Sequence, residues 1–416
     1  MATRIKRSPK AAAPQVLLDD IQAAALRIEN SVLLTPCTES HALSEITGSR
    51  IFCKLDNLQH TGSFKERGAC NALMQLPAPA RRLGVIAASA GNHALGLSYH
   101  ARRLGIPATV VMPVQAPLIK ITRCERLGAR VILHGSDFSE ARAHAQTLAQ
   151  QEALSYIHGF DDPQIIAGQG TIGLEVLAQV PHLDAMIIPI GGGGLIAGAA
   201  IAIKSLNPKI KIIGVESSQA AAFSAALSAG HPVPLPKLPT LADGLAVFEV
   251  GSTAFTLARP HIDQVVTVDE NTIALAILRH IELEKTVVEG AAATPLAALI
   301  SGQLPELKGK TVALAIGGGN IDPLILSSVV EKSLVTDGRL IRFVVGISDR
   351  PGGLARLTRT IADAGASIKD IAHDRTFNGP DTSAVRVTCT VETRNRSHIA
   401  EMNQALQRAG FTVSPA

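Results

Sequence analysis

Short apolar segments that run into glycine-containing loops recur along the 416-residue chain, and they constrain its fold more than any other feature. In each repeat the loop is followed by a helical pattern and a further apolar segment, as in residues 84–113 and 184–216. Strand, loop, helix and strand in this order give parallel strands joined by right-handed crossovers. A last strand pattern, at residues 311–316, enters a third such loop. The pattern therefore predicts an α/β fold with two open parallel sheets.

The character of the chain changes at about residue 340. From there, strand and helix patterns follow in the order βαββαβ within fewer than 80 residues, which is typical of a ferredoxin-like unit. We therefore expect a large α/β domain over residues 1–335, with a smaller subdomain at about 78–160. A separate ferredoxin-like domain should occupy residues 340–416, and the segment EKSLVTDG before it (331–338) reads as a linker.

Composition excludes several classes of function. Hydrophobic residues make up 46% and charged residues 18% of the chain, so it is globular rather than disordered. The net charge of +4 comes from interspersed charges, and aromatic residues are only 3%, which argues against a nucleic-acid partner. The five cysteines form no CxxC pair and no Cys/His cluster, so we expect neither a metal site nor disulfides. This cysteine usage fits a reducing, cytoplasmic location.

Two segments bear on membranes and targeting. Residues 185–203 carry no charge, but four consecutive glycines and Pro189 indicate a buried strand, a loop and a buried helix rather than a membrane span. The N-terminal residues 1–15 are basic and lack an apolar core, so they are no secretory signal. A disordered arm and a weak transit peptide both stay open, with the arm favoured.

One lysine stands in a setting that suits covalent chemistry. Lys65 lies between Phe64 and a short glycine turn in the stretch TGSFKERGA, directly after a strand pattern at 51–55. A lysine amine reacts with carbonyls when a pocket lowers its pKa and holds it still. A solvated surface lysine is the ordinary alternative, so the interpretation depends on the rest of the chain.

The loops supply what such a lysine would need. Ligands of open α/β sheets bind beyond the carboxyl ends of the strands, where helix N-termini favour anions. Gly191–Gly194 lets several N–H groups converge on a compact phosphate, and Ser89–His93 suits a carboxylate, with the Asn92 amide as a further donor. Gly317–Asn320 would let the backbone approach a flat ring. A Schiff-base lysine, a phosphate cradle and a ring site are the parts of a pyridoxal 5'-phosphate (PLP) enzyme.

A dinucleotide site is the competing interpretation. Gly192-x-Gly194-x-x-Ala197 matches the dinucleotide fingerprint, and Glu216 follows about 20 residues later. Four consecutive glycines suit a compact phosphate better, and this interpretation leaves Lys65 without a role.

Taken together, these motifs resemble those of the PLP-dependent threonine/serine ammonia-lyases (threonine dehydratases) of fold type II, over nearly the whole chain. The matching stretches are TGSFKERGA (61–69), SAGNHALG (89–96), GFDDPQIIAGQGT (159–171), IGGGGLIAG (190–198), IGVES (213–217), LADGLAV (241–247), VVEG (287–290) and GGGN (317–320).

The resemblance implies roles for individual residues. Lys65 would form the Schiff base with PLP, and Phe64 would pack beside the ring. Asn92 would bond the phenolic oxygen of the ring, and Gly191, Gly192, Gly193, Gly194 and Leu195 would hold the phosphate. The loop of Ser89, Ala90, Gly91, Asn92 and His93 would take the substrate carboxylate.

The last 77 residues resemble an ACT domain. Its ligand loop is matched at the first strand–helix junction by Asp349, Pro351, Gly352 and Leu354. ACT domains commonly bind amino acids at dimer interfaces, so the resemblance implies feedback by a branched-chain amino acid and a homo-oligomer, either a dimer or a tetramer.

The sequence departs from the family pattern in four places. Leu95 stands where the family has Gln, and residues 288–293 read VEGAAA instead of VEGAGA. Gly317 replaces the Ser that faces the pyridine nitrogen. Ala222 stands where metal-binding relatives carry an acid six residues after Glu216, so no metal is expected.

The resemblance implies dehydration and deamination of L-threonine to 2-oxobutanoate and ammonia, with L-serine a weaker substrate. Ala90 stands where serine racemases carry a proton-donating Ser, which favours elimination over racemisation. The alternatives are a dehydratase of another β-hydroxy amino acid such as 3-hydroxyaspartate, a serine racemase, or an inert amino-acid sensor.

Overall fold

The computed structural model describes residues 15–236, 238–374 and 384–415. The structure has two compact units, Met1–Ile321 and Asp322–Ala416. The second unit thus includes the helix that precedes the predicted ferredoxin-like domain, and the domain limits drawn from the sequence stay a prediction. The N-terminal arm expected from the sequence lies outside the described residues.

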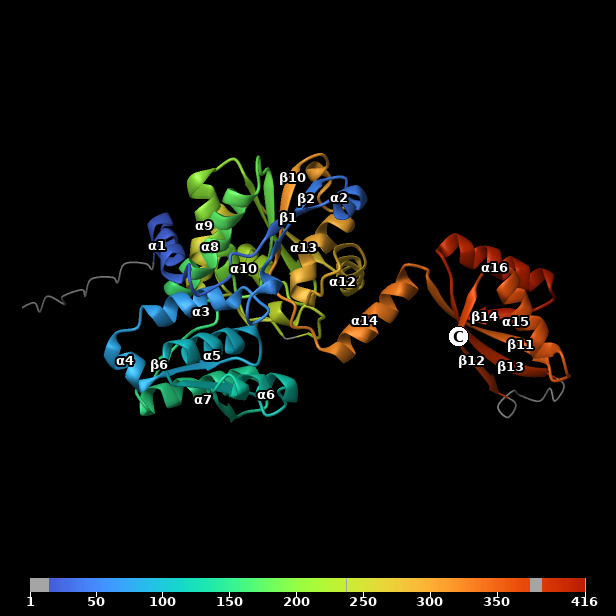
Figure 1. Cartoon of the computed structure of the whole chain (residues 1–416), viewed down its shortest axis with the longest axis horizontal. Helices are drawn as coiled ribbons and strands as arrows, with labels where there is room; N and C mark the ends of the chain where they lie inside the picture. Colours follow the sequence, from blue (N-terminus) through green and yellow to red (C-terminus); the bar gives the residue numbers. More distant parts are fainter. Residues whose placement is uncertain (1–14, 237, 375–383, 416) are drawn as a thin grey trace, which may run out of the picture. The chain divides into compact units, whose positions relative to one another are not determined.

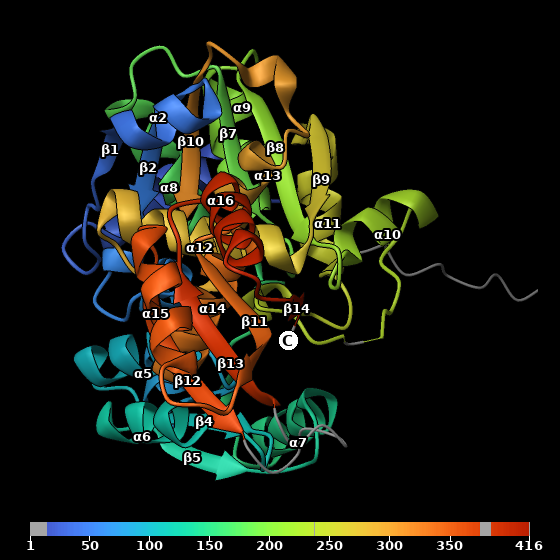
Figure 2. The ribbon, with the colours of Figure 1, turned by 90° about the vertical axis from the view of Figure 1, so that its right-hand side faces the viewer.

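A six-stranded sheet forms the centre of the first unit (Figure 1). Its strands lie in the order β1-β2-β10-β7-β8-β9, which can be followed across Figure 2. All neighbours pair in parallel except the edge strand β1, which is antiparallel to β2. The strands are β1 (Cys37–Ser40), β2 (Arg50–Leu55), β7 (Ala185–Pro189), β8 (Lys211–Ser217), β9 (Gln264–Val268) and β10 (Thr311–Ile316).

Helices cover both faces of this sheet, which explains why its central strands β7 and β10 are almost continuously apolar. All five residues of β7 are buried, for example. In Figure 1, α1, α8 and α9 lie on one side of the sheet, and α2, α12 and α13 on the other. The helices of this part are α1 (Leu18–Ile28), α2 (His41–Thr47), α8 (Pro163–Gln179), α9 (Gly194–Leu206), α10 (Ala222–Ala229), α11 (Ser252–Ala258), α12 (Glu270–Glu284) and α13 (Gly290–Ile300).

A smaller parallel sheet lies within residues 78–160, the predicted smaller subdomain. Its order is β5-β4-β3-β6, and α5 and α7 pack on opposite faces (Figure 1). Its elements are α4 (Ala78–Leu83), β3 (Val85–Ala88), α5 (Asn92–Leu104), β4 (Ala108–Met112), α6 (Leu118–Arg126), β5 (Arg130–Leu133), α7 (Phe138–Gln151) and β6 (Ser155–Tyr156). Helix α3 (Lys65–Met74) packs against both α5 of this subdomain and α8 of the larger one.

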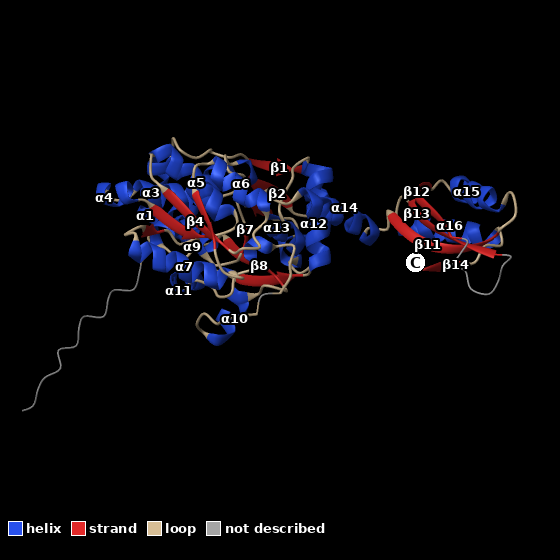
Figure 3. Cartoon of the chain, turned by 90° about the horizontal axis from the view of Figure 1, so that it is seen from below, coloured by secondary structure: helices blue, strands red, loops and turns tan. Residues whose placement is uncertain are grey.

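The second unit has the predicted βαββαβ order and an antiparallel sheet, β12-β13-β11-β14. Helices α15 and α16 pack on it around a core that includes Phe343, Leu357 and Met402 (Figure 3). After α14 (Pro323–Thr336), its elements are β11 (Leu340–Ser348), α15 (Gly353–Asp363), β12 (Ser367–Asp374), β13 (Ala384–Glu392), α16 (Arg396–Arg408) and β14 (Val413–Pro415).

Most of the predicted elements are found within one or two residues of their predicted limits, and the α/β class with a ferredoxin-like unit is confirmed. Residues 185–203 form β7, a loop and most of α9, as predicted. In the described part of the chain, no helix is both long and apolar enough to cross a membrane. The short strands β1 and β9 were not predicted, and the antiparallel β1 makes the larger sheet mixed at its edge.

Candidate active site

Lys65 is the first residue of α3, and its side chain faces the segment before α8. The preceding turn needs Gly62, whose φ of +76° is left-handed and whose added Cβ would lie 2.8 Å from Asn320 Oδ1. Lys65 Nζ donates to the Gly159 carbonyl at 2.8 Å. Burial lowers the pKa of Lys65 to about 8, and the negative charge of Glu289 opposes this shift. The lowered pKa enlarges the unprotonated, nucleophilic fraction of the amine near neutral pH.

The glycine loop after β7 meets the segment that holds Lys65. A Cβ on Gly192 would lie 2.2 Å from the Phe160 ring, and a Cβ on Gly194 would lie 2.5 Å from the Phe160 carbonyl oxygen. Gly193 has a φ of +93° and is the N-cap of α9. The first N–H groups of a helix have no partner within it and attract anions. The loop thus brings an anion-binding helix end beside residues 159–160.

The loop after β3 presents Asn92 at the start of α5. The Asn92 side chain donates from Nδ2 to both carboxylate oxygens of Glu289, at 2.8 and 3.0 Å, and its Oδ1 accepts from Asn320 Nδ2 at 2.9 Å. Ser89 Oγ accepts from the backbone N–H groups of Gly91 and Ala94 and so shapes the turn.

Two residues predicted to touch ligands have side chains engaged elsewhere. His93 Nε2 lies 3.1 Å from the Ile157 carbonyl, and Gly159 packs against the His93 ring. The His93 ring therefore packs against the segment that contains Gly159, whose carbonyl accepts from Lys65. Leu195 is buried in the main core of the first unit, so only its backbone can face a ligand.

The loop after β10 closes the site. The Gly317 carbonyl accepts from the Phe64 N–H at 2.9 Å, and Ser63 forms an isolated β-bridge with Gly318. A Cβ on Gly317 would lie 3.0 Å from the Phe64 ring. The structure thus brings the predicted lysine, Phe64 and Gly317 together, although they lie some 250 positions apart in the chain.

Glu289 is the site residue that sequence reasoning missed. It lies in the VVEG stretch, 6% exposed, with its carboxylate against Asn92. Burial raises the pKa of Glu289 to about 7; the Asn92 hydrogen bond opposes this rise and the charge of Asp243 adds to it. A lone acid before the apolar run 290–300 was the available signal, because a buried carboxylate needs a partner.

A buried ion network supports the start of α3. The Arg67 side chain, fully buried, pairs with Asp56 at 2.6 Å and with Glu175 at 2.5 Å. Glu175 also pairs with Lys54, whose side chain is fully buried as well. Since Arg67 lies two positions after Lys65, the network fixes this turn of α3 to the residue that follows β2 and to α8.

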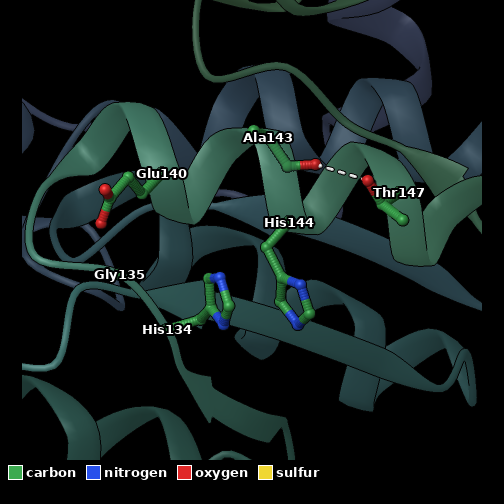
Figure 4. Close-up of a pocket in the computed structure, with 6 residues that line it drawn as sticks. All are labelled: His134, Gly135, Glu140, Ala143, His144 and Thr147. Carbon is green, nitrogen blue, oxygen red and sulfur yellow. Dashed lines mark hydrogen bonds between the residues drawn. The ribbon is translucent and has the colours of Figure 1, made fainter.

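Outside the site, a cavity of about 560 Å³ lies between the end of β5 and α7. Its wall includes the stacked rings of His134 and His144, whose centroids are 3.8 Å apart (Figure 4). None of the loops described above lines it. In the part of the chain that the structure describes, no three His, Cys, Asp or Glu residues gather in a way that could hold a metal ion.

The predicted effector residues lie in the second unit, in the loop between β11 and α15 and, for Leu354, in the first turn of α15. Asp349, Pro351 and Gly352 are exposed, and Leu354 is half-buried against the core. Gly352 has a φ of +94° and is the N-cap of α15.

These residues fit PLP. A partly buried lysine has a lowered pKa, the glycine loop has no room for side chains, and Ser63 Oγ is buried with no hydrogen-bond partner among the described residues. These are the features of a lysine-linked, phosphate-bearing ring site.

Comparison with known proteins agrees. The family model "Pyridoxal-phosphate dependent enzyme" matches residues 28–318, and the ACT domain model matches residues 341–410. The L-threonine ammonia-lyase of Thermotoga maritima is 42% identical over 398 residues, covering 96% of this chain and 99% of the relative. That of Geobacter sulfurreducens is 45% identical over 393 residues, covering 94% and 98%. The solved maize serine racemase has a TM-score of 0.73 and 32% identity, covering 77% of this chain and 98% of that one. The chain belongs to the pyridoxal-phosphate-dependent enzymes, in the threonine ammonia-lyase family, and carries a C-terminal ACT domain.

Proposed function

We propose that this protein dehydrates and deaminates L-threonine to 2-oxobutanoate and ammonia, and acts on L-serine more weakly. The observation that carries the proposal is the amine of Lys65, which has a lowered pKa and lies beside the Gly159–Phe160 segment against the glycine loop. The similarity to L-threonine ammonia-lyases along almost the whole chain supports this choice of substrate.

The residues assigned to the cofactor follow from this geometry. Lys65 would bind PLP covalently, and Phe64 and Gly317 would lie beside its ring. The backbone of Gly191–Leu195, at the start of α9, would hold the phosphate. Asn92 would donate to the phenolic oxygen of the ring. When bound, PLP withdraws electrons from the substrate and makes the Cα proton removable.

The protein residues would then perform the proton chemistry. Once the substrate amine has displaced Lys65 from the cofactor, the freed Lys65 amine would take the Cα proton, because its lowered pKa leaves it partly unprotonated near neutral pH. The backbone N–H groups of residues 89–93 orient the substrate carboxylate. The Ala90 side chain offers no proton to the opposite face of Cα, which disfavours racemisation. The β-hydroxyl would leave as water, taking up the proton that the Lys65 amine removed from Cα. The released enamine then loses ammonia to water.

Racemisation is the second candidate, favoured by the similarity to maize serine racemase. The test is to supply the PLP-loaded protein with L-threonine, L-serine and 3-hydroxyaspartate and to measure keto-acid release and D-amino-acid formation separately. We expect the fastest keto-acid release from L-threonine. D-serine as the main product, or a PLP absorption band with no turnover of any substrate, would overturn the proposal.

Residue 317 offers a test of how the ring is held. Gly317→Ser should change turnover modestly, since Phe64 need yield only a few tenths of an ångström to a Cβ. Gly317→Asp should lower turnover strongly, because a carboxylate would raise the pKa of the ring nitrogen and draw a proton onto it. The measurement is the ratio of elimination to solvent-deuterium exchange at Cα. A Gly317→Asp protein with the wild-type ratio would show that residue 317 does not face the nitrogen.

We infer that the ACT domain regulates the enzyme through an amino acid such as isoleucine or valine, bound near Asp349, Pro351, Gly352 and Leu354. Its chain order and core are complete without the first unit. Removing residues 338–416 should therefore leave dehydration but abolish any response to these amino acids, in assays with and without each effector. A soluble, PLP-loaded truncation without lyase activity would instead make the domain part of the active assembly.

We further propose that the protein is a homo-oligomer of the cytoplasm. The dimer interfaces at which ACT domains bind effectors favour the oligomer, and the five free cysteines suit a reducing compartment.

A further inference from the structure

The Glu289 carboxylate does not cap the helix that begins after it. Glu289 is the N-cap of α13, a position where a side-chain oxygen usually accepts from the first turn, yet its side chain makes no such bond. Instead both oxygens accept from Asn92 Nδ2, at 2.8 and 3.0 Å, across 197 positions of sequence. The buried carboxylate therefore leaves the first turn of its helix uncapped and accepts hydrogen bonds from the Asn92 amide instead.

Glu289 and Asn92 together link three loops of the site. The Glu289 N–H donates to the Gly318 carbonyl at 3.0 Å. The Asn320 side chain in turn donates to Asn92 Oδ1 at 2.9 Å and to the Thr61 carbonyl at 2.8 Å. Space for this arrangement depends on Gly318, because a Cβ there would lie 2.4 Å from Glu289 Oε1.

These contacts fix the orientation of the Asn92 amide. The Asn92 oxygen accepts from the Asn320 side chain. If the amide flipped, its NH2 group would face the Asn320 NH2 group, and its oxygen would face the Glu289 carboxylate, so both hydrogen bonds would be lost. One hydrogen of Nδ2 is shared between the two Glu289 oxygens, and the second remains for a ligand. An amide that holds its N–H groups in this way is preorganised to donate to an acceptor in the site.

We propose that Glu289 is a positioning residue of the active site, which locks the Asn92 amide so that its free N–H faces the cofactor ring. The proposal rests on the assignment of Lys65 and Asn92 to the PLP site, and not on the identity of the substrate. The strength of the lock depends on the charge of Glu289, because a carboxylate accepts hydrogen bonds more strongly than a neutral carboxyl group.

The lock should therefore respond to pH. The charged groups around Glu289 are Lys65 on α3, Asp243 at the start of the short turn Asp243–Leu245, and Lys120 on α6. With a pKa raised to about 7 by burial, Glu289 becomes neutral as the pH falls through neutrality. The hydrogen bonds from Asn92 to Glu289 then weaken, and the electronic environment of the PLP ring changes as a result.

The first experiment follows the visible absorption of PLP bound to the full-length protein between pH 6 and 9. In the wild type we expect a spectral transition with a midpoint near 7, and in Glu289→Gln we expect that transition to disappear. Glu216→Gln is the matched control, since Glu216 is also buried with a raised pKa but bonds only Phe223 and Ser224. An unchanged transition in Glu289→Gln, or its equal loss in the control, would overturn the proposal.

The second experiment measures how fast PLP leaves the protein, by its fluorescence, in Asn92→Ala, Glu289→Leu and the double variant. Each single change should speed release by about 10-fold or more, as expected for loss of a charged hydrogen bond. The double variant should be no faster than Asn92→Ala, because Glu289 acts through Asn92. Fully multiplicative effects would show that the two residues act independently.

Neither readout uses turnover, so failure of threonine to react would refute the proposed function and leave this test standing. If Glu289→Leu does not fold, the isosteric Glu289→Gln replaces it in the release measurement. There it should speed release less than Asn92→Ala, since an amide oxygen can still accept from Nδ2.

Discussion

Lys65→Ala is expected to remove the covalent attachment of PLP and nearly all turnover. Loss of a positioned general base alone costs about 10²- to 10⁴-fold in rate, and loss of the covalent link adds to this. The fold should survive, because burial disfavours the charged amine and its removal relieves a cost present at neutral pH. The measurement is PLP retained on the protein after borohydride reduction, together with keto-acid release from L-threonine.

Lys204→Ala provides the matched control. Lys204 is also mostly buried and pairs with Asp263 at 2.7 Å, but it lies near the far end of α9. It should keep both the reducible linkage and the turnover. A Lys65→Ala protein with as much reducible linkage as the wild type would show that another lysine binds the cofactor.

Arg67→Ala should destabilise the first unit by about 3–5 kcal/mol, the usual cost of removing one partner from a buried ion pair. The change leaves the buried Asp56 and the mostly buried Glu175 without their shared cation. The free energy of unfolding in denaturant measures the effect. Arg50→Ala, which removes the exposed pair with Glu39, should change it little.

The loss in Arg67→Ala should also depend on pH. Burial alone would raise the pKa of Asp56, but the charge and hydrogen bonds of Arg67 hold it below its ordinary value. The pairing therefore contributes stability above the ordinary pKa of an Asp and loses it as the pH falls. In the variant, Asp56 lacks the cation that stabilises its charged form, so it can become neutral by taking up a proton as the pH falls. The gap between the two proteins should be smaller near pH 4 than near pH 7, and a gap that widens in acid would contradict this account.

The sequence predicted those parts of the fold that have a strong local pattern. The continuously apolar β7 and the helical spacing of α5 are examples, because burial on both faces or on one stripe shows directly in the order of residues. The edge strand β1 and the strand β9 were missed, since short, partly exposed strands have neither pattern. Their place is set by pairing with β2 and β8, which sequence order alone does not reveal.

For the site, motifs predicted which loops meet but not what each side chain does there. The structure places Phe64 against Gly317 and links Asn92 to the same loop through Asn320, whereas the ring of His93 turns to Ile157. A helix N-terminal loop can bind through its backbone while its side chains point elsewhere, and the sequence does not distinguish these cases. The role of Glu289 was missed because it depends on a contact with Asn92, which lies 197 positions earlier in the sequence.

The position of β10 between β2 and β7 has a consequence for how the chain acquires its structure during synthesis. The turn before Lys65 is held by the Gly317 carbonyl and the Asn320 side chain, which the ribosome adds about 250 residues later. Until β10 emerges, β2 and β7 each expose an unpaired, apolar edge, the kind of surface on which nascent chains aggregate. Pairings of such long separation close slowly. The larger sheet can therefore be completed only after β10 has left the ribosome, when most of the chain has already been made.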